Sequence, residues 1–164
     1  MVFNKIDSFV NQNTQAILPY ANSSYQSIVY EGGEAYKCHD TPKKIIEDAC
    51  LFAGSTYAGR RIAATKLLGY QRKTPILVCP HRRICLMPTG APERFMDCSW
   101  FSVLHIAKII NNYEGTNHPA IQLKSGVYIS VPNSYIVLRQ QFERAQTCLN
   151  FFTERENDSG YFSS

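Results

Sequence analysis

The sequence predicts an α+β fold: a single domain with short antiparallel hairpins and a long C-terminal helix. The first observation is size, because 164 residues, 45% of them apolar, can bury a core without disulfide or metal support. The second is that short apolar segments flank two glycine-containing turns, a pattern typical of β-hairpins. The third is an apolar stripe at helical spacing near the C-terminus.

Three parts are expected along the chain. Residues 1–25 are rich in Asn, Gln and Ser, and are expected to be poorly ordered or to form only a short strand around residues 16–18. Residues 26–156 are expected to hold the folded domain, and residues 157–164 a C-terminal tail. No internal repeat, low-complexity tract or proline- and glycine-rich linker divides the chain, so a second domain is not expected.

The first hairpin is expected at residues 27–30 and 35–38, because two glycines between these segments supply the positive φ angles of a tight turn. A helix from about residue 42 to 53 follows. Thr41 is its expected N-cap, a proline occupies its first position, and Gly54 is its expected stop.

Residues 57–68 leave two interpretations open. One is a helix capped by Ser55 or Thr56. The other is a strand, because Gly59 disfavours a helix by about 1 kcal/mol relative to alanine and two residues of the segment are β-branched.

Two short strands are expected next, at residues 75–79 and 84–87, with Arg82 and Arg83 at the tip of the loop between them. Residues 99–110 are apolar and fit either a strand or a helix.

A second hairpin is expected at residues 121–123 and 127–131, and Ser134 is expected to cap a long helix that reaches about residue 156. The apolar stripe of this helix fits either a dimer seam or, more commonly, packing on the protein's own sheet. It consists of Tyr135, Leu138, Phe142, Ala145, Leu149 and Phe152.

Positive charge is concentrated in one stretch of the chain. Eight basic residues lie there, most of them arginines: Arg60, Arg61, Lys66, Arg72, Lys73, Arg82, Arg83 and Arg94. Glu93 alone opposes them, which gives the stretch a charge of +7, whereas the whole chain carries +4. Such a stretch predicts binding to the phosphates of DNA through counterion release, with a merely solvated basic face as the alternative.

Aromatic residues interleave with these charges and suit either base stacking on single strands or burial in the core. They are Tyr57, Tyr70, Phe95 and Trp100. For Trp100, burial is the expectation because it lies in an apolar stretch.

Metal binding and catalysis are weaker hypotheses. Four residues have the chemistry of zinc ligands, Cys79, His81, Cys85 and Cys98, but their spacing lacks a C-x-x-C knuckle. A nucleophile at Cys98 or Cys148 with His105 as base is the only catalytic pair that the residue types permit. We therefore expect no enzyme, no metal and no cofactor, and small-thiol or zinc chemistry remains an alternative.

The N-terminus lacks the basic start and apolar stretch of a signal peptide, and no apolar run is long enough to span a membrane. A cytoplasmic protein without membrane contact is expected. In that reducing compartment the six cysteines are expected to remain thiols.

Five segments, in this order along the chain, resemble the ComK family, the competence transcription factors of Gram-positive bacteria. They are Gly54-Ser-Thr-Tyr-Ala-Gly-Arg-Arg61, Thr74-Pro-Ile-Leu-Val-Cys-Pro80, Leu86-Met-Pro-Thr89, Cys98-Ser-Trp100 with His105, and Ser134-Tyr135. The resemblance implies that residues 26–156 form a DNA-binding domain. It also implies an activator of DNA-uptake genes that works as an oligomer, recognises paired A·T-rich boxes of double-stranded DNA largely through the minor groove, and needs no cofactor.

The family motif implies four site residues: Tyr57, Gly59, Arg60 and Arg61. Five further DNA-binding candidates are proposed on charge alone: Lys66, Arg72, Lys73, Arg82 and Arg83. The sequence departs from the family pattern at Ala53 and Thr56, where an aromatic residue and a serine are more common.

The chain also ends soon after the last expected helix. Family members with a longer C-terminal tail use it to bind a Clp-protease adaptor, so this partner is in question here, as is full activator function. The alternative is a ComK-like protein-interaction or regulatory module that lacks full activator function.

Overall fold

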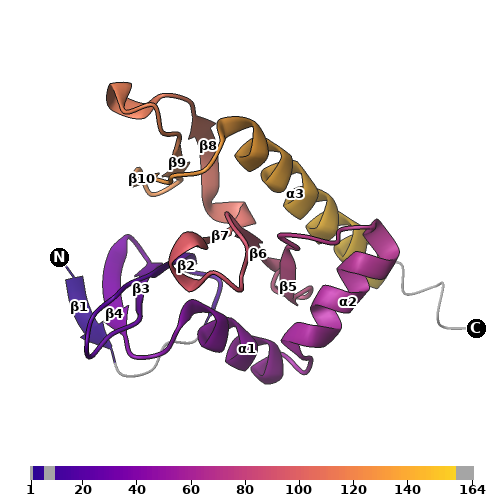
Figure 1. Ribbon diagram of the computed structural model, residues 1–164. Helices are drawn as coiled ribbons and strands as arrows, with labels where there is room; N and C mark the ends of the chain where they lie inside the picture. The colour runs from indigo at the N-terminus through magenta and orange to yellow at the C-terminus, as the bar shows by residue number, and fades with distance from the viewer. Residues whose placement is uncertain (1, 6–9, 158–164) are drawn as a thin grey trace, which may run out of the picture.

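The computed structural model describes residues 2–5 and 10–157. They form a seven-stranded sheet with the order β1-β4-β3-β2-β7-β6-β5, a three-stranded sheet with the order β10-β9-β8, and three α-helices (Figure 1). Paired strands are antiparallel except β1 and β4, which are parallel. The fold class is α+β, as predicted, in a single domain that ends in a long helix.

The strands of the large sheet are β1 (Val2–Lys5), β2 (Thr14–Pro19), β3 (Ser27–Glu31), β4 (Glu34–Cys38), β5 (Ile76–Cys79), β6 (Ile84–Pro88) and β7 (Trp100–Ser102). Those of the small sheet are β8 (Ile106–Ile110), β9 (Ala120–Leu123) and β10 (Tyr128–Ser130). The α-helices are α1 (Pro42–Phe52), α2 (Tyr57–Leu68) and α3 (Tyr135–Asn157), and the 3-10 turns are η1 (Phe95–Asp97), η2 (Val103–His105) and η3 (Tyr113–Gly115).

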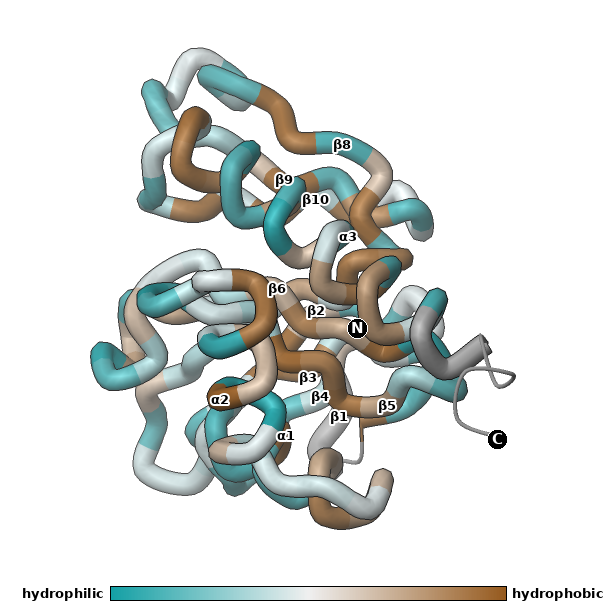
Figure 2. Tube along the Cα trace, turned by 90° about the vertical axis from the view of Figure 1, so that its right-hand side faces the viewer, coloured by the Kyte–Doolittle hydropathy of each residue, from teal (hydrophilic) through white to brown (hydrophobic). Residues whose placement is uncertain are grey.

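Both faces of the large sheet are covered. Figure 1 shows α1 below it, α2 next to β5, and α3 with the small sheet above it. Successive residues therefore enter different cores: in β7, Trp100 packs on the α1 side and Phe101 on the α3 side. In β2, Ile17 and Ala16 divide in the same way. Figure 2 shows the resulting hydrophobic strands between more hydrophilic outer segments.

Residues 57–68 form helix α2, which decides between the two interpretations of this segment. At its start the N–H of Gly59 donates to Thr56 Oγ1 over 2.9 Å, and at its end the N–H of Gly69 donates to the carbonyl of Thr65 over 3.0 Å. Gly69 adopts the left-handed conformation with φ +78°. An N-cap contributes about 1 kcal/mol, which offsets the helix penalty of Gly59.

Both predicted hairpins, the helix that begins after Thr41 and the long helix after Ser134 are confirmed. Residues 99–110 form neither one strand nor one helix. The chain runs through β7 in the large sheet, turns at η2, and enters the small sheet as β8. This apolar segment contributes to both sheets, which explains why its pattern fits no single element.

The N-terminal segment holds more structure than expected. β2 contains the predicted residues 16–18, but it is longer and lies inside the large sheet between β3 and β7. β1 was not expected; its four residues pair in parallel with β4, which lies about 30 positions further along the chain. Of the expected tail, residue 157 ends α3, and residues 158–164 lie outside the described residues.

The apolar stripe of α3 packs on the protein's own sheets, as the commoner of the two interpretations predicted. Leu138, Ala145 and Leu149 are all buried in the core that also contains Met87 and Phe101. These side chains are not free to form a dimer seam. No helix within the described residues has the length and apolar character to cross a bilayer.

Replacing Phe101 by alanine should lower the free energy of unfolding by about 3–5 kcal/mol, because the fully buried ring leaves a cavity. Ile136→Ala is the matched control: this α3 side chain is 67% exposed, and its loss should change stability by less than about 0.5 kcal/mol. Urea denaturation measures both. Equal effects of the two substitutions would contradict the two-sided core.

Candidate nucleic-acid interface

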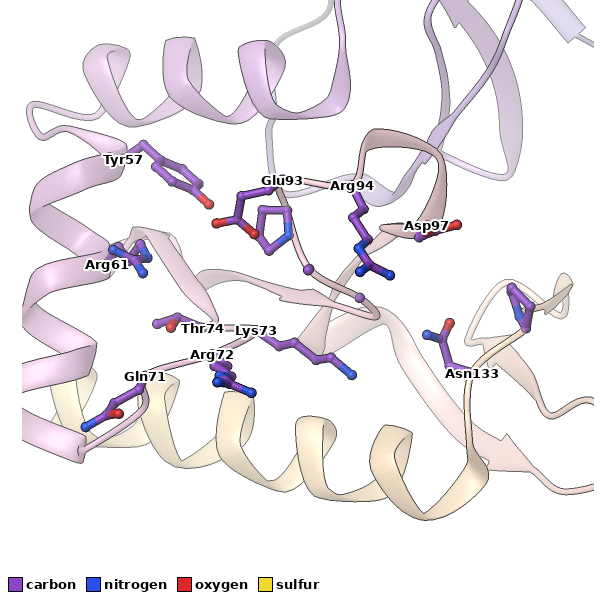
Figure 3. A pocket seen from close by; sticks show the side chains of 14 residues that line it. Tyr57, Arg61, Gln71, Arg72, Lys73, Thr74, Glu93, Arg94, Asp97 and Asn133 are labelled. Atoms are coloured by element: carbon purple, nitrogen blue, oxygen red, sulfur yellow. The ribbon is translucent and has the colours of Figure 1, made fainter.

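A cleft of about 680 Å³ opens beside α2 (Figure 3). Its walls come from the start of α2, the α2–β5 loop, the β6–β7 loop and the segment that leads into α3. Four basic residues line it, and we call them the cleft cations: Arg61, Arg72, Lys73 and Arg94.

The β5–β6 hairpin explains why these segments meet. Ile76 of β5 pairs with Leu86 of β6, so the residues just before β5 lie beside those just after β6. This open end of the hairpin holds Lys73 and Gly90 in the cleft wall. A Cβ at Gly90 would lie 2.3 Å from the carbonyl oxygen of Asp97, so only glycine permits this close approach of the β6–β7 loop to itself.

The cleft is basic but not uniformly so. Glu93 and Asp97, both exposed, also line it, and Figure 3 shows Glu93 next to Tyr57 and Arg61. Four cations against two carboxylates leave the lining with a positive charge of 2. The arrangement can therefore attract an anionic chain, while the carboxylates limit where that chain fits.

Tyr57 forms part of the cleft wall and is half-buried. Its ring meets Trp100 edge to face with centroids 6.4 Å apart, and Lys43 Nζ lies 5.3 Å from the centroid of the tyrosine ring. Burial raises the pKa of Tyr57 to about 12, so its hydroxyl stays protonated. Trp100 is only 1% exposed, which confirms the expected burial.

The side chains of the two motif arginines, Arg60 and Arg61, point in different directions. Successive residues of an α-helix differ by about 100° in direction, and only Arg61 lines the cleft. Arg60 is half-buried, and its Nε donates to Ser55 Oγ over 3.1 Å. Gly59 has a local role, because a Cβ there would lie 2.9 Å from Thr56 Oγ1, the oxygen that caps α2.

Arg82 and Arg83 lie at the closed end of the β5–β6 hairpin, away from the cleft. A strand of four residues spans about 13 Å, at roughly 3.3 Å per residue. Arg82 borders a different hollow, which Glu31 and Glu34 also line. Lys66 is exposed in the last turn of α2. We call the four basic residues outside the cleft the outer cations: Arg60, Lys66, Arg82 and Arg83.

Several cleft residues were absent from the predicted site, and Arg94 and Asn133 are two of them. Arg94 belonged to the basic stretch but had no motif support, and Asn133 follows the second hairpin without any charge signal. Spatial proximity joins them to Arg61, and the sequence carries no sign of it.

The structure gives little support to the alternative hypotheses of thiol catalysis and metal binding. Cys98 is 2% exposed, and burial raises the pKa of its thiol to about 11, which keeps it protonated and unreactive at neutral pH. The ring Nε2 of His105 lies 2.6 Å from the carbonyl oxygen of Gln12. Across the described part of the chain the cysteines form no disulfide, and no three His, Cys, Asp or Glu side chains are grouped there to hold a metal ion.

Comparison with known proteins first defines the class of protein. The chain is 28% identical over 148 residues to the competence transcription factor of Bacillus subtilis (strain 168), an overlap of 89% of this chain and 75% of that protein. The class is that of competence transcription regulators, which is not an enzyme class. The family described as ComK protein matches residues 6–157, so the chain belongs to the ComK family. No solved structure matches it.

Alkaline titration should show that Tyr57 ionises late. Its pKa is about 12 in the fold, against about 10 for an exposed tyrosine, so the neutral phenol stabilises the fold below pH 10, and this contribution is lost as the pH rises through 12. The fluorescence of Trp100, the single tryptophan, reports the change because a neighbouring phenolate quenches it.

We expect quenching near pH 12 in the wild type and its loss in Tyr57→Phe. Quenching centred at pH 10 that disappears in Tyr57→Phe would show that the ring is not buried against Trp100.

Proposed function

We propose that this chain is a sequence-selective, DNA-binding activator of competence genes, which serve DNA uptake, and that it acts inside the cell. A transcription-factor family implies DNA as a partner. The observation that carries the proposal to particular residues is the cleft, where three separate segments bring the cleft cations together.

The charges and their exposure support contact with a sugar-phosphate backbone. Arg72 and Arg94 are exposed and lie on different loops of the cleft. A phosphate backbone that runs along the cleft contacts both loops, and each neutralised phosphate releases counterions. Arginine also forms paired hydrogen bonds to phosphate, which lysine does not.

We propose that recognition is directed to A·T-rich boxes, largely through the minor groove. A·T tracts have a narrow, electronegative minor groove that favours inserted arginine side chains. The loop arginines Arg72 and Arg94 suit this role because loops reach further than a helix face into a groove about 6 Å wide.

Recognition of paired boxes requires two binding units, so we propose a homo-oligomer. Because Leu138, Ala145 and Leu149 of the α3 stripe are buried within one chain, we propose that the contact between copies uses a different surface. The Clp-protease adaptor would act on the C-terminal region, of which residues 158–164 lie outside the described residues.

The double substitution Arg61→Ala, Arg72→Ala should weaken binding to an A·T-rich duplex. Each phosphate contact contributes about 0.9 to the slope of log K against log salt concentration, so removing two should make the slope shallower by about 2. Titrations by fluorescence anisotropy at several salt concentrations measure it.

The matched control is Arg82→Ala, Arg83→Ala, which removes the same charge from the closed end of the hairpin and should leave most of the slope intact. If both pairs lower the slope equally, the outer cations bind DNA as well and the cleft is not the specific contact. Single substitutions of Arg60 and Arg61 separate the two motif arginines, and we expect the larger loss for Arg61→Ala.

Replacing A·T pairs of the boxes by inosine·cytosine should leave binding nearly unchanged, whereas G·C should weaken it. Inosine·cytosine presents the same minor-groove pattern as A·T because it lacks the guanine amino group, while its major groove resembles that of G·C. Competition titrations with the three duplexes measure the effect. Loss of binding to the inosine duplex would place recognition in the major groove and reject the minor-groove proposal.

A further inference from the structure

The side chain of Gln141 in α3 lies behind the cleft and is only 3% exposed. Its Nε2 donates to the carbonyl oxygen of Lys73 over 2.7 Å and to that of Pro88 over 3.1 Å. Lys73 belongs to one wall of the cleft, and Pro88 ends β6, where the loop that carries Arg94 begins. One buried amide therefore joins the backbones of both walls.

Arg144, one turn further along α3, extends this connection. Its NH1 donates to Gln141 Oε1 over 2.8 Å, and its NH2 donates to the carbonyl oxygen of Arg72 over 3.0 Å. The guanidinium carbon lies 4.3 Å from the centroid of the Tyr70 ring. Arg144 thus orients the amide of Gln141 and holds the loop of Arg72 from inside.

We propose that Gln141 and Arg144 are positioning residues, which fix the spacing of the cleft cations before DNA arrives. The ligand is the duplex of the proposed function, on which this inference rests. Neither side chain lines the cleft. They act through the carbonyls of Arg72, Lys73 and Pro88, and so set where the two loops lie relative to each other.

The contacts of Arg144 separate positioning from a simple effect of charge. Its planar guanidinium bonds two acceptors at once and stacks on Tyr70, whereas the ammonium group of lysine keeps the charge without this fork geometry. Arg144→Lys therefore preserves the net charge and removes the positioning. A residue that acts by charge alone would tolerate the change.

The first experiment titrates wild type and Arg144→Lys with an A·T-rich duplex at several salt concentrations. We expect affinity to fall about tenfold, as for the loss of one charge-assisted contact, and the salt slope to become shallower by about 1, because one loop cation no longer meets its phosphate. Arg139→Lys is the matched control: Arg139 is exposed, donates to Tyr135 of its own helix, and should bind as the wild type does. Equal binding by Arg144→Lys and Arg139→Lys would overturn the inference.

Gln141→Met provides the second pair, with Gln140→Met, an exposed neighbour, as control. Methionine keeps the size of the buried side chain and removes the two N–H donors. We expect Gln141→Met, at a temperature where both variants are folded, to show the same loss of affinity and salt slope. A lower melting temperature with an unchanged salt slope would show a structural role only and reject positioning.

Hydrogen exchange without DNA distinguishes failure of this inference from failure of the proposed function. Peptides covering residues 69–75 and 88–94 should exchange faster in Arg144→Lys and Gln141→Met than in the two controls. If the wild type fails to bind duplex DNA while exchange still rises in both loops, the proposed function is rejected and the positioning of the cleft stands. Unchanged exchange in the two loops would overturn the positioning itself.

Discussion

Two-sided burial of the large sheet is the constraint on which the rest of the structure depends. Its inner strands pack against a core with α1 on one face and a core with α3 on the other. Neighbouring residues such as Trp100 and Phe101 therefore point to opposite cores, and both are buried. Strands with both faces covered have no side chains left for solvent. Polar and charged groups are therefore displaced to the strand ends, and the β5–β6 hairpin has cations at both ends: Lys73 at the open end and Arg82 at the closed end.

The rotation of α2 about its own axis separates the two motif arginines. α2 contacts the core mainly through Ala64 and exposes much of its surface, so its direction is set by its caps and by its packing beside β5. Once that direction is fixed, Arg61 must face the cleft and Arg60 must turn toward Ser55. A sequence motif that treats the two arginines as a unit thus covers two environments, one exposed and one half-buried.

Local signals were sufficient for most elements of the fold. Glycine turns, the Thr41 cap and the periodicity of α3 each act over a few residues, and each predicted its element. β1 and the break of residues 99–110 into two sheets depend on partners distant in the chain, which local patterns do not encode. The candidate site shows the same limit. The basic stretch was visible in the sequence as charge, but the length of the strands and the direction of each helix face decide which cations lie together. Gln141 gave no signal, because a glutamine in a polar helix reveals nothing of the carbonyls behind it.

The two groups of cations suit different physical roles. Screening at physiological salt has a length of about 8 Å, so charges as far apart as the two ends of the β5–β6 hairpin act nearly independently on a bound phosphate. The outer cations can raise the rate of encounter, which depends on the summed field of the surface. Lasting contact requires cations whose spacing matches that of successive phosphates. The two loops that carry Arg72, Lys73 and Arg94 are tied together from within, since the amide of Gln141 bonds the carbonyls of both Lys73 and Pro88, where the β6–β7 loop begins. A preorganised cleft loses less conformational entropy on binding than loops that must first be ordered. On the proposed function we therefore expect affinity to be concentrated in the cleft, even though it holds only half of the eight cations of the basic stretch.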